Sequence, residues 1–308
     1  MPDKVMSAKE AVQEFVKDGE MLRSGGIALR KPMALLHEVI RQKKRGITFV
    51  TSGFTFDGDL MVGSGCINRL EGSYFGLEAL GLSANYRRAQ EKSIPQYVPL
   101  EEYTNYGMTI RYMAGAMGLP FFPGKGLLGS DIPKYSHADL NQKTHEMDCP
   151  FTGERVMLLP AIHPDVAFLH AQRCDHEGNV QIWGQIGDDQ WGTLSAKHIV
   201  VSVEEIVDES VVRGDPNRTI IPGFRVDAIV EAPFGAHPSQ CQGYYDLDLD
   251  YKMMYTEQVR TREGYLQYLD EWIHGVPDHN AYLAKVGRDR LEQLRAKSKF
   301  CQPVNYGY

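Results

Sequence analysis

The stretch from Met21 to Val50, MLRSGGIALRKPMALLHEVIRQKKRGITFV, decides the fold. Its first residues, Met21 to Ile27, predict a strand, and Pro32 suits the first turn of the helix that follows. One apolar stripe is expected on this helix, formed by Leu35, Leu36, Val39 and Ile40. Ile47 to Val50 is rich in β-forming residues, so the next strand is predicted there.

The residues before this stretch predict another helix. Ser7 and Glu10 have the spacing of a capping box, in which each side chain bonds to the other residue's backbone N–H. Helix, strand, helix and strand therefore alternate over the first fifty residues. Because this order is typical of parallel strands joined by helices, we expect an α/β fold with an open, mainly parallel sheet and helices on both faces.

The remaining sequence continues the pattern less regularly. Helices are predicted at Ser83–Gln90 and Thr104–Met117, and two more at Thr256–Lys297, divided near Pro277. Strands are predicted at Leu119–Phe122, Val156–Leu159, Val166–Leu169, Val180–Trp183, Ile199–Ser202 and Val226–Val230. Long irregular stretches are expected at Gly53–Gly65, Pro123–Pro150 and Gly235–Asp250, and such loops tend to carry function. With no repeat or clear linker, residues 1–308 are expected to form a single domain with a helical tail at about 256–298.

Composition and charge exclude several classes of protein. The chain is 43% hydrophobic and 24% charged, which is a globular balance rather than a disordered or fibrous one. The net charge is −7, and the most basic run, Arg41 to Arg45, follows a helical pattern. Such a run is typical of a solvated helix end, so no nucleic-acid partner is expected.

Cysteine usage and hydropathy point to the cytoplasm. The five cysteines, Cys66, Cys149, Cys174, Cys241 and Cys301, are odd in number and include no CxxC pair, which favours free thiols in a reducing compartment. The charged, amphipathic N-terminal segment does not resemble a signal peptide. No run approaches the roughly 18 apolar residues needed to cross a bilayer, so we expect no membrane partner.

Two glycine-bearing segments are candidate ligand sites. Gly25 and Gly26 lie between a strand and a helix, where backbone can approach a ligand and free N–H groups can bind an oxyanion. The alternative is an ordinary strand-to-helix turn. Lys125, in Pro123-Gly-Lys-Gly126, could face a ligand phosphate or simply be solvated on an exposed turn. A Walker A motif, a GxGxxG fingerprint after a strand and a GxSxG elbow are all missing from the sequence.

Three further candidates rest on single side chains. Glu78 lies in an apolar, glycine-bearing stretch and would have a raised pKa if buried, whereas an exposed Glu78 would simply start the next helix. His237 and Ser239 follow a predicted strand, at the edge where open α/β sheets bind ligands, although His237 could be a structural histidine. His170, Cys174 and His176 resemble zinc ligands, but no fourth ligand follows at metal spacing, so no metal is expected.

These segments together resemble the A subunit of family I CoA-transferases, the glutaconate CoA-transferase type. The resemblance covers nearly the whole length. Its most specific parts are Gly25-Gly26-Ile27 with Arg30-Lys31-Pro32, Met117–Phe121, Ile182–Gly184, Val226–Cys241, and Asp278-His279 with Tyr282-Leu283.

The resemblance implies an open α/β sheet shared with certain sugar-phosphate isomerases. It also implies a B-type subunit of similar fold, in an α2β2 or larger assembly, and ping-pong transfer of CoA between small organic acids, dicarboxylates among them. The chain would bind CoA and acyl-CoA as substrates and hold no tightly bound cofactor. Gly25, Gly26, Ser73, His237 and Ser239 would contact the substrate or its oxyanion. Glu78 would be a catalytic residue in the pocket, and Lys125 would bind CoA.

The nucleophile of the family is a glutamate in a Ser-Glu-Asn-Gly type motif, and this sequence contains no Glu-Asn pair. The resemblance therefore implies that the B-type partner supplies the nucleophile and that this chain is inactive alone. The chain departs from the family at Ile27, where Phe is usual, and at Tyr74–Gly81. Related two-subunit proteins that lack the glutamate decarboxylate or hydrolyse acyl-CoA, and a non-catalytic acyl-CoA-binding protein is the remaining alternative.

Overall fold

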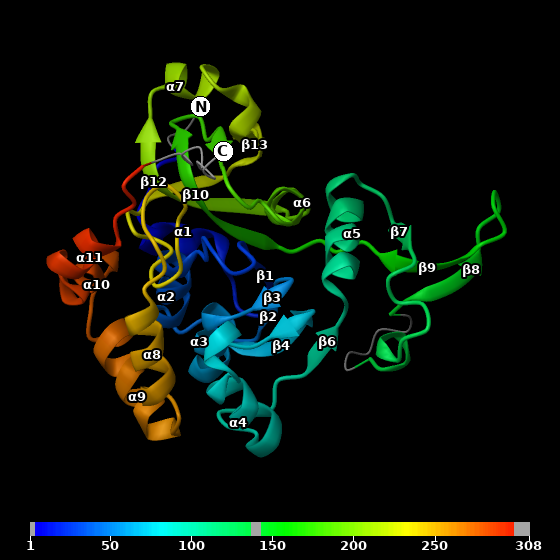
Figure 1. Cartoon of the computed structure of the whole chain (residues 1–308), viewed down its shortest axis with the longest axis horizontal. Helices are drawn as coiled ribbons and strands as arrows, with labels where there is room; N and C mark the ends of the chain where they lie inside the picture. The colour runs from blue at the N-terminus through cyan, green and yellow to red at the C-terminus, as the bar shows by residue number, and fades with distance from the viewer. Residues whose placement is uncertain (1–3, 137–142, 299–308) are drawn as a thin grey trace, which may run out of the picture.

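A computed structural model of the chain describes residues 4–136 and 143–298 (Figure 1). Its centre is a nine-stranded sheet in which seven strands are mutually parallel. Across the sheet these strands are β14 (Ala228–Glu231), β12 (His198–Val207), β10 (Val166–Asp175), β1 (Met21–Ser24), β2 (Ile47–Val50), β4 (Ile67–Gly72) and β6 (Leu100–Glu102). Two short strands, β11 (Val180–Gln181) and β13 (Thr219–Ile221), continue the sheet in antiparallel pairing. The predicted open, mainly parallel sheet is confirmed.

The strand order reverses at the centre of the sheet. From β1 the chain moves outward through β2, β4 and β6, whereas from β10 it moves in the opposite direction through β12 and β14. Strands β1 and β10 are parallel neighbours, with Leu22 opposite Val166. The chain therefore leaves the carboxyl ends of these two strands in opposite directions, which is the position where open α/β sheets bind ligands.

Helices cover both faces because strand side chains alternate between the two faces of the sheet, and each face carries hydrophobic residues. One core contains Phe49, Phe168 and Val200. The next residue along each of these strands points to the opposite face and belongs to a different core, as Val50, Leu169 and Val201 do. The first core is covered by α1 (Ala8–Phe15), α2 (Met33–Arg41), α3 (Phe56–Ser64), α4 (Ala84–Lys92), α8 (Leu249–Gln258), α9 (Arg262–Leu269) and α10 (His279–Val286). The opposite face is covered by α5 (Asn105–Ala116) and α6 (Asp189–Leu194).

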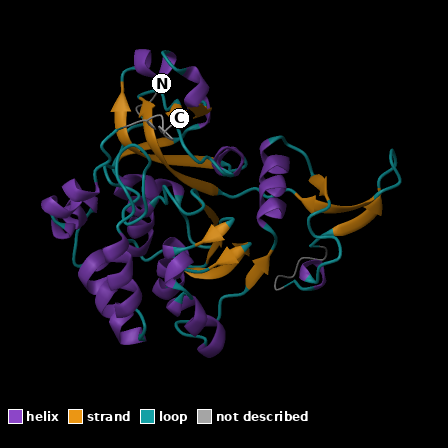
Figure 2. Cartoon of the chain, viewed as in Figure 1, coloured by secondary structure: helices purple, strands orange, loops and turns teal. Residues whose placement is uncertain are grey.

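A separate three-stranded antiparallel sheet projects from the body beyond α5, as Figure 2 shows. It consists of β7 (Phe121–Gly124), β9 (Arg155–Pro160) and β8 (His145–Asp148). A further small sheet pairs β3 (Gly53–Phe54) with β5 (Tyr74–Phe75). None of the helices in the described part of the chain is long and apolar enough to cross a membrane.

The local expectations are mostly confirmed. The Ser7–Glu10 capping box forms at α1, and Pro32 precedes α2 as its N-cap. The irregular stretch expected at Gly53–Gly65 is wrong, because α3 occupies most of it. Eight of the nine residues of α3 are buried, including Asp57 and Asp59, so this helix has no polar face that sequence periodicity could reveal.

The C-terminal region is helical as expected but contains more helices than the predicted two. Helix α8 begins earlier, at Leu249, and Thr261 caps a separate α9. A π-helical turn (Asp270–His274) extends α9, and the chain breaks near Pro277 before α10 and α11 (Arg288–Leu294). The additional break arises because Thr261 offers its side chain to the N–H of Gly264, a local cap that competes with continuing the helix.

Candidate active site

Gly25 and Gly26 lie at the carboxyl end of β1, where the strand order reverses. The N–H of Gly25 donates to the Phe168 carbonyl at 2.8 Å, which ties β1 to β10 just before the two strands diverge. A Cβ atom at Gly25 would lie 2.9 Å from that carbonyl oxygen, so the close approach requires glycine. Open α/β sheets bind ligands at this kind of reversal, so the candidate site is the loop that follows.

The loop from Gly25 to Lys31, the glycine loop, is held at both of its ends by residues from distant parts of the chain. The N–H of Gly26 donates to the Asp189 carboxylate at 2.6 Å. At the other end, the N–H of Arg30 donates to the Gln240 carbonyl at 2.8 Å, and that of Lys31 to Ser239 Oγ at 3.1 Å. These anchors come from elements about 160 to 210 residues further along the chain.

Buried ion pairs support the same loop. Asp189 lies 3.0 Å from the Arg30 guanidinium and 3.3 Å from that of Arg23, and Asp188 lies 3.2 Å from Arg23. Lys31 Nζ pairs with Asp57 at 3.0 Å. Burial alone lowers the pKa of Arg23, but the two aspartates outweigh burial and raise that pKa, so the guanidinium stays charged. Removing one partner of such a pair leaves an uncompensated buried charge, so the arrangement is rigidly specified.

The middle of the loop is left unbonded. Among the hydrogen bonds between described residues, none uses the N–H groups of Ile27, Ala28 or Leu29 as a donor. Ile27 and Ala28 are half-buried and Leu29 is buried. Successive free N–H groups in a held loop can stabilise an oxygen that becomes negatively charged during a reaction. The arrangement can therefore act as an oxyanion site.

The predicted oxyanion residues Gly25 and Gly26 are next to these free groups but are not free themselves. Both of their N–H groups are already bonded, to Phe168 and Asp189. Their conformational role is clear, because Gly26 has a φ of +73° and a Cβ there would lie 2.0 Å from the Leu29 carbonyl oxygen. Their direct contact with a substrate stays a prediction.

Ser73 lies at the carboxyl end of strand β4. This half-buried residue follows β4, and its hydroxyl donates to the Ser52 carbonyl and contacts the Asn105 side chain. The Ser52 hydroxyl in turn donates to Asp188. Ser73 is thus connected through Ser52 to Asp188, which pairs with Arg23 of β1, and its contact with substrate stays a prediction.

The two residues predicted in the Gly235–Cys241 loop are buried. Ser239 Oγ accepts the N–H of Lys31 and donates to the Ala236 carbonyl at 2.8 Å, which makes it a support of the glycine loop. His237 contacts the Tyr282 hydroxyl at 2.7 Å and the Asp248 carboxylate at 3.0 Å. Burial lowers the pKa of His237 despite this carboxylate. Both ring nitrogens are used, so the structure favours the structural interpretation of His237, and a substrate contact stays a prediction.

The contacts of Glu78 and Lys125 within the described part of the chain are with residues other than the loop anchors. Glu78 is exposed, begins a 3-10 helix (Glu78–Leu80) and lies 3.5 Å from the Nζ of the buried Lys252. This matches the alternative of an exposed helix-starting glutamate rather than a buried acid. Lys125 is 59% exposed, pairs with Glu154 at 2.9 Å and lies on the projecting sheet, where its CoA contact stays a prediction.

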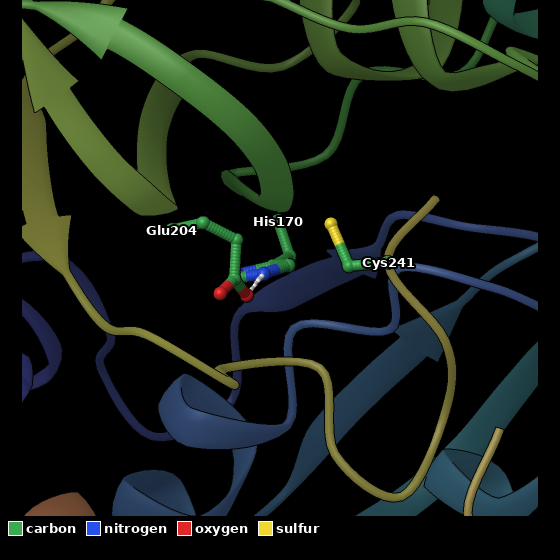
Figure 3. Close-up of side chains that lie close together, drawn as sticks. All are labelled: His170, Glu204 and Cys241. Carbon is green, nitrogen blue, oxygen red and sulfur yellow. Dashed lines mark hydrogen bonds and ion pairs between the residues drawn. The ribbon is translucent and has the colours of Figure 1, made fainter. Parts of the chain in front are cut away.

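A buried cluster of His170, Glu204 and Cys241 lies behind the site, with ligand-type atoms within 4.8 Å of one another (Figure 3). The Glu204 carboxylate already accepts hydrogen bonds from His170 at 2.7 Å, the Tyr245 hydroxyl at 2.8 Å and the Phe234 N–H at 2.8 Å. Burial raises the pKa of the Cys241 thiol well above its ordinary value, which disfavours the thiolate that a metal needs. The cluster is therefore better suited to hydrogen bonding than to a metal.

Sequence reasoning missed the acids that hold the loop, Asp188 and Asp189. One local signal pointed to them, since Arg23 lies inside an otherwise apolar strand and a buried arginine requires an acidic partner. The sequence around Asp188 does not identify it as that partner, because α6 is short and its acids precede no apolar stripe.

Comparison with known proteins relates the whole arrangement to one family. The family model described as coenzyme A transferase matches residues 5–232. The A subunit of the 3-oxoadipate CoA-transferase of Pseudomonas knackmussii is 34% identical, over 93% of this chain and 99% of that protein. The A subunit of the glutaconate CoA-transferase of Acidaminococcus fermentans is 33% identical, over 95% and 94% of the two chains.

Comparison with solved structures relates the chain to the same family. The glutaconate CoA-transferase from Acidaminococcus fermentans superposes with a TM-score of 0.88 over 95% of this chain and 96% of that chain, at 33% identity. A variant of the decarboxylase AibA/AibB superposes with a TM-score of 0.72 over 87% and 99% of the chains, at 32% identity. An uncharacterised Archaeoglobus fulgidus protein is 40% identical over 96% of this chain, which spans 65% of that protein's length. The chain therefore belongs to the coenzyme A transferase family and corresponds to its A subunits.

Proposed function

We propose that this chain is the A subunit of a two-subunit CoA-transferase that moves CoA between small organic acids. In this proposal the chain supplies the oxyanion loop at Ile27–Leu29, and a B-type partner supplies the nucleophilic glutamate. The observation that carries the proposal is a loop whose ends are bonded and whose central N–H groups are free, placed where the strand order reverses.

The state of the nearby carboxylates supports a nucleophile from outside this chain. Asp57 is paired with Lys31, Asp188 with Arg23, and Asp189 with Arg30. All three acids are buried within the chain. A carboxylate bonded to a buried cation is a poor nucleophile, because attack would leave that cation without its counter-charge. A glutamate from a partner could approach the half-buried side of Ile27 and Ala28.

The proposed reaction begins when the partner's glutamate attacks the thioester carbonyl carbon. The C–S bond breaks, CoA leaves as a thiolate, and a mixed anhydride joins the acyl group to the glutamate. The thiolate then attacks the glutamyl carbonyl, which releases the first acid and leaves a glutamyl-CoA thioester. An acceptor carboxylate reverses these steps and departs as the new acyl-CoA. At each attack the carbonyl oxygen becomes negative, and the free N–H groups of the loop would stabilise it.

The substrate class follows from the relatives. Two A subunits at 33–34% identity carry the names of 3-oxoadipate and glutaconate, both of them dicarboxylates. We therefore propose a short dicarboxylic acid as one acyl partner. CoA and acyl-CoA would be bound as substrates, with no tightly bound cofactor.

The remaining features of the proposal concern assembly and location. Residues 1–308 would act as one domain, and the active form would be an α2β2 or larger complex, without nucleic acid or membrane. A reducing compartment such as the cytoplasm is supported by four cysteines that form no disulfide within the described chain, Cys66, Cys149, Cys174 and Cys241. Cys301 lies outside the described residues.

The second candidate is a decarboxylase or hydrolase acting on acyl-CoA, and it is favoured by the structural match to the AibA/AibB decarboxylase. The two candidates differ in the partner's nucleophile, because only transfer requires a glutamyl-CoA intermediate. A non-catalytic acyl-CoA-binding protein would form no such intermediate and need no partner.

The test is reconstitution. The chain is co-expressed with the B-type protein encoded beside it, and CoA exchange is measured with glutaryl-CoA as donor and acetate or succinate as acceptor. Exchange by the complex, none by the isolated chain, and inactivation by borohydride after acyl-CoA addition are expected. Robust exchange by the chain alone, or acyl-CoA consumption without borohydride sensitivity, would refute the proposal.

A further inference from the structure

The Ile27 side chain occupies the space between two loops at the carboxyl edge of the sheet. Its Cγ2 lies 3.6 Å from the position of a Cβ at Gly53, the first residue of β3. On its other side, a Cβ at Gly187 would lie 2.7 Å from Ile27 Cδ1. Two glycines that carry no side chain thus leave a slot that this isoleucine fills.

The slot opens outward. Gly53 is buried, whereas Gly187 and its neighbours Gly184, Gln185 and Ile186 are exposed, and Ile27 itself is half-buried. The N–H of the same residue belongs to the unbonded group at the centre of the loop. An acyl carbon whose oxygen contacts that N–H would place its chain within reach of the Ile27 methyl groups.

We infer that Ile27 determines which acyl chain lengths and shapes the site accepts, with Gly53 and Gly187 as the walls against which it packs. This inference rests on the proposed function and names the residue that sets its specificity. The backbone on the Gly187 side of the slot is fixed, because it continues directly into Asp188 and Asp189, which are held by hydrogen bonds to Arg23 and to the Gly26 N–H. A change in size at residue 27 is therefore expected to alter the space for the substrate rather than to be absorbed by the protein.

The test uses the reconstituted complex and a series of malonyl-, succinyl-, glutaryl- and adipyl-CoA. Ile27→Ala is expected to raise kcat/KM for the longer donors relative to the shorter ones by about tenfold or more, since one methylene in an apolar pocket discriminates by about 10- to 200-fold. Ile27→Phe is expected to shift the preference toward the shorter donors.

A second pair of variants probes the same contact from the opposite wall. In Gly187→Ala, which also strains the backbone because φ is +59° there, the new methyl group would press on Ile27 Cδ1 and push the side chain toward the substrate, which should favour shorter donors. Combining Gly187→Ala with Ile27→Ala removes that contact and should restore activity with the longer donors. Val211→Ala, a 40% exposed position on α7 (Glu209–Arg213), is the matched control and should leave the profile unchanged.

The outcomes separate the inference from the proposed function. If the unsubstituted complex exchanges CoA and all Ile27 and Gly187 variants that retain its thermal stability keep the same donor profile, the inference is overturned and the proposed function stands. If the unsubstituted complex exchanges CoA with none of the donors, the proposed function is overturned, and the inference with it.

Discussion

The carboxylate of Asp189 accepts the Gly26 N–H at 2.6 Å and pairs with Arg30 at 3.0 Å, so one buried acid holds two points of the glycine loop. This acid begins α6, on the sheet face opposite the core that packs α2. The shape of the loop, and with it the direction of its free N–H groups, depends on a residue that itself is not expected to touch the substrate.

Asp189→Asn should therefore reduce both stability and turnover. The amide keeps the size of the side chain. It removes the negative charge that pairs with two buried guanidinium groups, those of Arg23 and Arg30. We expect the free energy of unfolding to fall by about 3 kcal/mol, measured by urea denaturation, and kcat of the complex to fall more than KM rises. Glu209→Gln, in an exposed pair with Arg213, is the control and should change little. A variant as stable as the original chain would show that Asp189 does not hold the loop.

Ser239→Ala separates two roles for this serine. Its hydroxyl is the acceptor for the buried N–H of Lys31, and removing it should cost about 1–3 kcal/mol of unfolding free energy, measured in the same way. If Ser239 instead bound the substrate, KM would rise while stability stayed constant. Ser130→Ala, which removes a hydroxyl bonded within its own turn, serves as the control.

His37 should make the stability depend on pH. It is buried, neither ring nitrogen has a hydrogen-bond partner among the described residues, and burial holds its pKa well below the ordinary value. The folded chain therefore keeps His37 neutral while the unfolded chain protonates it below about pH 6.5. As the pH falls through this value, this histidine alone should lower the unfolding free energy by about 1.4 kcal/mol per pH unit.

His37→Leu should remove that contribution and flatten the stability profile between about pH 6 and pH 5. At pH 7.5 the variant should be as stable as the original or more so, since no hydrogen bond is lost. His163→Leu, at an exposed histidine, should leave the slope unchanged. An identical slope in the His37→Leu variant would contradict the assignment.

Glu78→Gln tests whether this exposed glutamate takes part in the reaction. If its carboxylate exchanges protons with the substrate, turnover of the complex should fall by about 100-fold while assembly stays intact. Steady-state kinetics and gel filtration of the complex measure both. Glu91→Gln, in an exposed helical pair with Arg87, is the control. Unchanged kinetics would leave Glu78 only its contact with Lys252.

Much of the fold could be predicted from local sequence. The alternation of strand and helix from Met21 to Val50, the Ser7–Glu10 capping box and the Pro32 helix start all form as predicted. These signals are readable because helical and strand periodicities, and capping, involve residues close in sequence. Helix α3 was missed for the converse reason, since a helix buried on every side has no amphipathic pattern.

The site was only partly predictable. The sequence predicts an oxyanion site at Gly25 and Gly26, whereas the N–H groups without a partner among the described residues belong to the next three residues, because Phe168 and Asp189 accept those of the glycines. Sequence alone could not decide whether Glu78 and His237 were buried or exposed, since burial depends on what packs over a residue.

The sequence by itself determined the alternating elements, the family and the absence of a Glu-Asn nucleophile pair. Only the tertiary structure decided which charges meet at the loop, because Arg23 and Arg30 find their acids about 160 residues away. A buried charge is tolerated only beside its partner, and that partner is chosen by how the sheet and α6 pack. The positions of the free N–H groups of Ile27, Ala28 and Leu29 follow from that choice.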